Sequence, residues 1–169
     1  RWATFQGNGS PLIRAIRERF PDAPSIVYKK HAGSGTPWDF ARGWIQQFVL
    51  ADSPDLILTY TNGDPAELDK MLTTIRRRTT ADVIVPTLHL FKRFTLSEED
   101  VERGVLDWEA VRVVCRRHQA ELVENRRELT QYMLANDLAI DDMLGDAVHE
   151  TRFAADCTVQ NIARHFHAT

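Results

Sequence analysis

Apolar residues recur at helical spacing in several stretches of the chain and run continuously in shorter stretches between them. The helical spacing predicts helices over 10–20, 38–50, 65–78, 107–135 and 151–166. The short apolar runs, rich in β-branched residues, predict strands over 25–28, 55–60, 83–86 and 137–140. Because strands and helices alternate, we predict an α/β protein whose parallel sheet lies between two layers of helices.

Local signals define the ends of two of these helices. Ser10 is a good N-cap before Pro11, which suits the first turn of a helix. Asp64 is expected to cap the helix that begins at Pro65, with Glu67 bonding back to the cap. The apolar faces of the predicted helices are then expected to carry Leu12, Ile16, Trp38, Ala41, Trp44, Ile45, Phe48, Leu68, Met71, Ile75, Cys115, Phe153, Cys157 and Ile162.

The 169 residues correspond to a single domain, 1–169. The first predicted element is a helix, whereas a three-layer α/β domain normally has a strand before it. We expect that strand to lie before Arg1 or to be reduced to residues 2–5. The loops 31–36, 61–64, 86–93 and 145–149 then follow strands, at the sheet edge where ligands bind in such folds.

The composition of the chain argues against several classes of function. A net charge of −3 argues against a general nucleic-acid binder. No apolar run approaches the roughly 18 residues that a membrane span needs. Cys115 and Cys157 are too few for a disulfide framework or a zinc site, and they are expected to be buried thiols.

The loop before the last helix contains Asp146 and His149, three residues apart. A histidine that acts as a general base needs a carboxylate to fix its tautomer and to stabilise the imidazolium. The alternative is that Asp146 only caps the loop and His149 is a surface residue. The spacing by itself leaves both interpretations open.

Two other loops could supply hydrogen-bond donors to an oxyanion. Gly35, in the small-residue loop 31–36, allows a backbone N–H to approach a ligand closely. Asn62 follows the strand 55–60, and its amide could be a second donor. Each loop can equally be an ordinary turn.

Taken in order, these loops resemble the sequence blocks of the SGNH (GDSL-type) hydrolase superfamily. Asp146-Ala147-Val148-His149 resembles the family pattern D-G-[IV]-H. Residues 28–36 resemble V-N-x-G-x-x-G-T, with Gly35 at the oxyanion glycine. Residues 54–64 resemble P-D-L-V followed by G-x-N-D, and the resemblance extends over residues 4–167.

The resemblance implies a flavodoxin-like α/β/α sandwich and a serine esterase, with no metal and no cofactor. His149 would accept the proton of the serine and Asp146 would orient His149, while Gly35 and Asn62 would bind the oxyanion. Ser34 and His89, both in loops at strand ends, would contact the substrate. The implied partner is a small-molecule or glycan ester, with acylated carbohydrate preferred, and not a nucleic acid or a membrane.

Two departures from the family pattern concern the reaction itself. Counting back from Gly35 places the family's nucleophilic serine near Trp2, so the serine either precedes Arg1 or is replaced. Residues 61–64 place Asn62 one position early. The first hypothesis is therefore an esterase or acetylesterase whose serine precedes Arg1. The alternative is an inactive SGNH-like module that binds a ligand or glycan, with Trp2 at the serine position. A signal peptide would also precede Arg1, so the compartment, secreted and periplasmic included, and the oligomeric state stay open.

Overall fold

The computed structural model describes residues 9–31, 40–41, 43–59, 64–88, 90 and 108–167. The chain divides into two compact units. The sheet unit comprises His31–Leu88 and Val105–Glu124, and the helical unit comprises Arg1–Lys30, His89–Gly104 and Asn125–Thr169. Each unit is described by itself.

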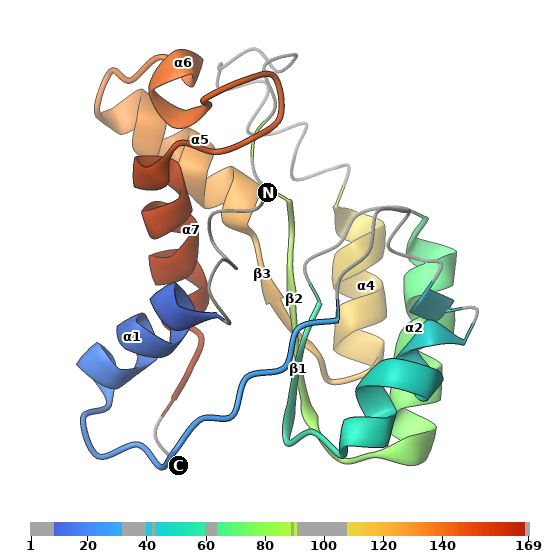
Figure 1. Cartoon of the computed structure of the whole chain (residues 1–169). Helices are drawn as coiled ribbons and strands as arrows, with labels where there is room; N and C mark the ends of the chain where they lie inside the picture. Colours follow the sequence, from blue (N-terminus) through green and yellow to red (C-terminus); the bar gives the residue numbers. More distant parts are fainter. Residues whose placement is uncertain are drawn as a thin grey trace. The chain divides into compact units, whose positions relative to one another are not determined.

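The sheet unit contains three parallel strands, β1 (Leu56–Leu58), β2 (Asp82–Pro86) and β3 (Glu121–Val123), in the order β1-β2-β3 (Figure 1). Ile57 pairs with Val83 and Val85 pairs with Leu122. β2 is the central strand, and its last four residues are buried. This result confirms the predicted α/β class and the parallel sheet.

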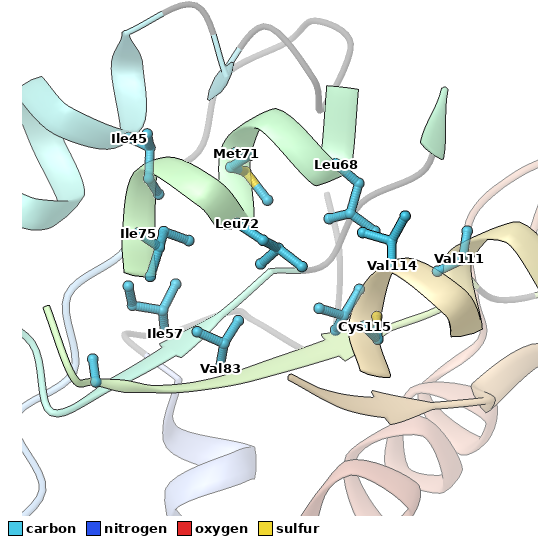
Figure 2. Close-up of a cluster of buried hydrophobic side chains, with 12 residues drawn as sticks. Ile45, Ile57, Leu68, Met71, Leu72, Ile75, Val83, Val111, Val114 and Cys115 are labelled. Carbon is cyan, nitrogen blue, oxygen red and sulfur yellow. The ribbon is translucent and has the colours of Figure 1, made fainter. Parts of the chain in front are cut away.

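Two helices, α2 (Pro65–Arg78) and α4 (Glu109–Arg117), lie side by side against one face of this sheet (Figure 1). Figure 2 shows Ile57 and Val83 of the strands beneath Leu72 and Ile75 of α2. The predicted apolar stripe of α2 is confirmed, because Leu68, Met71, Leu72 and Ile75 are all buried. The burial of this stripe against the strands is what fixes α2 on the sheet.

The start of α2 follows the sequence signal closely. Asp64 is the N-cap, and its carboxylate accepts a hydrogen bond of 2.9 Å from the backbone N–H of Ala66. Pro65 is the first helical residue, as predicted. The side chain of Glu67 is paired with Lys70 rather than with the cap.

The helix expected over 38–50 differs from the prediction in type and in the side that it buries. The structure has a π-helix, η3 (Ile45–Val49), followed by a 3-10 turn, η4 (Leu50–Asp52). Ile45 is buried as expected, but Trp44 and Phe48 are 43% and 45% exposed. A π-helix has more residues per turn than an α-helix, so positions at α-helical spacing do not share one face. Trp38 lies outside the described residues.

The helical unit contains α1 (Ser10–Arg19), α5 (Asn125–Ala135), α6 (Ile140–Met143) and α7 (Arg152–Ala163). α7 packs against α1 and against α5. A small core joins α5, α6 and α7, formed by Leu90, Leu129, Met133, Met143 and Ala154. The predicted last helix is thus confirmed, although Phe153 is exposed and Cys157 is only partly buried.

The beginning of the helical unit corrects two predictions. Gly9, with φ 73°, is the N-cap of α1, so Ser10 is the first helical residue. No strand forms over residues 25–28, and Val27 is 82% exposed. The ring of Tyr28 packs on Gly9, where a Cβ atom would lie 2.7 Å from ring carbon Cδ2. This segment packs through a side chain instead of pairing with a strand in the described part of the chain.

Two further predictions in the second half of the chain are wrong. The helix expected over 107–135 is interrupted by β3, because the chain turns at Gln119, which has φ 52°. The strand expected over 137–140 is a turn at Asp137, with φ 51°, followed by α6. Residues 91–104, expected to be irregular, lie outside the described residues.

Arg76 holds the turn between α4 and β3 in place. Its guanidinium donates hydrogen bonds to the carbonyls of His118, Gln119 and Ala81, at 2.7, 2.9 and 2.6 Å. These are charge-assisted bonds, two of them to carbonyl groups just after the end of α4 and one to the residue before β2. Arg76 therefore serves the end of α4 as well as the dipole of its own helix, the role expected from the run 76–78.

Candidate active site

Asp146 and His149 lie in a loop of the helical unit that joins α6 to α7. Leu144 and Glu150 form a single antiparallel bridge at the base of this loop. The N–H of Gly145 also donates to the carbonyl of His149 at 2.9 Å. The loop follows α6 instead of the strand expected there, and its closed base limits the positions that His149 can take.

Asp146 binds His149 through both of its carboxylate oxygens. Oδ2 lies 2.7 Å from Nδ1 of the imidazole. Oδ1 accepts backbone N–H bonds from Val148 and His149, both at 2.8 Å. The loop-capping role and the histidine-orienting role, which the sequence left as alternatives, are both present.

The charge state of Asp146 fixes the tautomer of His149. Hydrogen bonds from the N–H of Val148, then from the imidazole and the N–H of His149, lower the pKa of Asp146 from its usual value to about 2. An ionised carboxylate only accepts hydrogen bonds, so Nδ1 carries the proton. Nε2 of the neutral ring then has a free lone pair, as a general base requires.

Two other histidines in the described part of the chain also pair with aspartates. His31 binds Asp52 and His118 binds Asp69, each at 2.8 Å and each through Nε2. In these pairs the outer ring nitrogen is occupied, and the His118 side chain is only 12% exposed. His149 is bound through Nδ1 and its side chain is 45% exposed, so its Nε2 is not used in the pair. Of these three pairs, only that of His149 is made through Nδ1, the nitrogen through which a carboxylate orients a general-base histidine.

The other predicted site residues lie outside the described residues. They are Gly35 and Asn62, expected at the oxyanion, Ser34 and His89, expected at the substrate, and Trp2 at the serine position. The structure therefore brings together the aspartate and the histidine of the predicted site.

A buried polar cluster that the sequence did not predict lies next to the loop. Asn125 of α5 and Thr158 and Asn161 of α7 are 0%, 0% and 7% exposed. They are hydrogen-bonded to one another, and Thr158 also reaches Glu150. The available signal was a pair of polar residues, three apart, on the apolar stripe of the last helix.

A separate pocket of about 560 Å³ lies in the sheet unit, before β1 and β2 begin. Gln46, Ser53, Asp55, Arg78 and Thr79 are among its lining residues. Ligands of parallel α/β sheets bind at the opposite edge, where the strands end. This pocket is therefore not part of the candidate site.

Within the described ranges, no helix is both long and apolar enough to span a bilayer. The same ranges contain no cluster of three or more His, Cys, Asp or Glu side chains arranged to hold a metal ion.

No protein-family model matches the chain, and no curated protein matches it. Solved structures do. Axe2, an acetylxylan esterase from Geobacillus stearothermophilus, has a TM-score of 0.75 at 13% identity, over 96% of this chain and 82% of its own. LAE5, an alpha/beta hydrolase enzyme from the metagenome of Lake Arreo in Spain, has a TM-score of 0.71 at 18% identity, over 92% of this chain and 78% of its own. At these identities the likeness shows the fold alone, and the chain has the flavodoxin-like α/β fold of the SGNH hydrolases.

Proposed function

We propose that this protein is a serine esterase that hydrolyses carboxylic esters. The observation that carries the proposal is the 2.7 Å contact between Nδ1 of His149 and Oδ2 of Asp146. It sets the tautomer of the imidazole and leaves Nε2 outside the pair, on a half-exposed side chain. This is the chemistry that activates a serine hydroxyl.

In the proposed reaction, Nε2 of His149 removes the proton from the serine hydroxyl as the serine oxygen attacks the acyl carbon. The imidazolium, stabilised by Asp146, then gives that proton to the leaving alcohol, and an acyl-enzyme forms. Water enters next and loses a proton to Nε2 as it attacks the acyl group. Collapse of this second intermediate releases the carboxylic acid and restores the serine.

Each tetrahedral intermediate carries a negative oxygen that needs hydrogen-bond donors. We assign the backbone N–H of Gly35 and the side-chain amide of Asn62 to this role, together with the N–H of the serine. A donor of this kind typically contributes about 10²- to 10³-fold to kcat. Ser34 and His89 are assigned to contacts with the substrate.

The nucleophilic serine is assigned to the segment encoded before Arg1. In the family pattern the serine block stands at the end of the first strand, before the first helix. In this chain α1 begins at Ser10, and residue 2 is Trp. We do not assign the nucleophile to Ser10, which is the first residue of α1.

Structures of Axe2 support the assignment of the aspartate and the histidine. Variants of Axe2 described as catalytic mutants replace a histidine, an aspartate or a serine by alanine. In that protein the replaced aspartate precedes the replaced histidine by three residues, which is also the spacing of Asp146 and His149. As Axe2 is an acetylxylan esterase, we assign acetylated carbohydrate as the preferred class of substrate.

The test is the hydrolysis of p-nitrophenyl acetate by the protein expressed from its complete gene. We expect His149→Ala to lower kcat by about 10³-fold or more, because the base is lost. His118→Gln is the matched control, since it removes another histidine paired with an aspartate and should leave kcat unchanged. A wild-type rate in His149→Ala would sink the proposal.

A serine-directed fluorophosphonate locates the nucleophile in the same protein. We expect one labelled serine in the segment before Arg1, found by peptide mass spectrometry, and no labelling after His149→Ala. The competing function is an inactive module that binds a glycan, which the position of Trp2 favours. A folded protein that neither hydrolyses nor labels, yet binds an acetylated oligosaccharide in calorimetry, would establish that function.

A further inference from the structure

We propose that Glu150, Thr158 and Asn125 are positioning residues that hold the His149 loop in its reactive geometry. The inference rests on the proposed function and adds residues to the same site. Glu150 directly follows His149 in the chain. The two side chains of adjacent residues serve different partners, since His149 binds Asp146 and Glu150 binds Thr158.

The contacts form a continuous line from the loop into the helical unit. Thr158 Oγ1 donates to Glu150 Oε1 at 2.5 Å and accepts from Asn125 Nδ2 at 3.1 Å. Asn125 Oδ1 accepts from Asn161 Nδ2 at 2.9 Å. Arg164 is bonded to Asn161 and, at 2.6 Å, to Glu128. The line therefore runs from the partly exposed pair of Arg164 and Glu128, through buried side chains of α5 and α7, to the base of the loop.

The burial of these groups makes them effective anchors. Asn125 and Thr158 are fully buried and Asn161 is 7% exposed, so water does not replace a broken hydrogen bond there. A buried polar group that loses its partner costs far more than one on the surface. Shifting Glu150 outward would break the bond to Thr158, so the buried groups resist that movement.

The base of the loop transmits this restraint to His149. Glu150 is bridged to Leu144, and the carbonyl of His149 accepts from the N–H of Gly145. On the far side, the N–H of Thr151 donates to the carbonyl of Met143 at 2.8 Å. With the backbone held on both sides of His149, the ring has few positions other than that facing Asp146.

Buried polar residues are not the side chains that would stabilise the packing of α5 against α7 most. Well-packed apolar residues of similar volume are often neutral or stabilising in place of buried polar groups. The neighbouring core of Leu129, Met133 and Met143 is purely apolar. Of the buried polar residues described in this unit, Asn125, Thr158 and Asn161 are in line with Glu150, whereas Thr130 bonds to its own helix. The first three suit a role in fixing the loop.

The experiment uses Thr158→Val, which keeps the shape of the side chain and removes the hydroxyl, and Thr158→Ser, which restores the hydroxyl. Thr130→Val is the matched control, because Thr130 is also buried on a helix of the same unit and its hydroxyl bonds to its own helix at Arg126. Glu150→Ala is the second variant, which breaks the line at the loop and keeps the buried part. It keeps the test decisive if Thr158→Val does not fold.

The first readout is the Nδ1–H proton of His149 in NMR spectra, assigned by its loss in His149→Gln. This signal reports the contact with Asp146 without any need for activity. We expect Thr158→Val and Glu150→Ala to broaden or remove it, and Thr158→Ser and Thr130→Val to retain it. Wild-type signals in both Thr158→Val and Glu150→Ala would overturn the inference.

The second readout is the division between kcat and KM with p-nitrophenyl acetate. We expect Thr158→Val to lower kcat by about ten- to a hundredfold with KM within about twofold, since a small displacement of a catalytic group costs that much. Thr158→Ser should recover the rate. If the wild-type protein shows no hydrolysis, the proposed function fails, whereas the NMR signals still decide the positioning role. If the wild type is active and Thr158→Val matches Thr130→Val in both readouts, only the positioning role fails.

Discussion

Asp146 contacts His149 at two places, the imidazole Nδ1 through Oδ2 and the backbone N–H through Oδ1. Substitution of Asp146 by asparagine should keep the backbone contact and change the contact with the imidazole. In Asp146→Asn the amide oxygen can still accept the backbone N–H bonds, so the loop should keep its shape. The amide nitrogen, however, is a donor and would move the imidazole proton to Nε2.

We therefore expect Asp146→Asn to lower kcat by about 10³- to 10⁴-fold with little change in the thermal unfolding temperature. Asp69→Asn provides the control, because Asp69 is also paired with a histidine, His118. Steady-state kinetics and thermal unfolding of both variants check the prediction. Equal kcat values for the two variants would contradict the role assigned to Asp146.

The acid stability of the loop follows from the pKa of Asp146, which is lowered to about 2 by its hydrogen bonds in the folded protein. An unfolded aspartate has a pKa of about 3.9. The stabilisation by the ionised form is therefore complete above about pH 4 and is lost as the pH falls towards 2. A titration of the Asp146 carboxyl carbon by NMR measures this directly. A midpoint near 4 would contradict the prediction.

The three carbonyl bonds of Arg76 predict a loss of stability in Arg76→Lys. Lysine keeps the charge but cannot donate to three carbonyls in the fixed geometry of a guanidinium. We expect a decrease of roughly 2 kcal/mol in the free energy of unfolding. The control is Arg77→Lys, because Arg77 is an exposed residue of the same helix. Urea unfolding of both variants gives the comparison.

The thiols of Cys115 and Cys157 should react more slowly than the thiol of a catalytic cysteine. Cys115 is 1% exposed, and burial raises its pKa to about 12. Burial also raises the pKa of Cys157, a partly buried thiol. Because the thiolate is the reactive form, we expect slow reaction of both thiols with Ellman's reagent at pH 8 and fast reaction in denaturant. Fast labelling of Cys115 in the folded protein would contradict its burial.

The sequence predicted those parts of the fold whose signals are local and strong. Asp64-Pro65 marked the start of α2, and the spacing of Leu68, Met71 and Ile75 marked its buried face. Asp146 and His149 could be paired from the sequence because they share one short loop. Such features depend on neighbouring residues and not on the rest of the chain.

The elements that were missed depend on tertiary contacts. β3 has only three residues between two helix-forming stretches, and its turn uses Gln119 with positive φ, where glycine or asparagine would have given a signal. The carbonyls of this turn are held by Arg76, 43 positions away from Gln119. The π-helix after Trp44 has no local signal, and the polar pair on the last helix does not reveal that its partner is Asn125, 33 positions before Thr158.

The double role of Asp146 affects how related sequences should be compared. Because its Oδ1 closes the loop, a descendant that lost catalysis would still gain from keeping an aspartate there. His149 has no such structural task for its side chain beyond the pair itself. Across an alignment, persistence of the aspartate alone therefore reports the shape of the loop and does not by itself indicate catalysis.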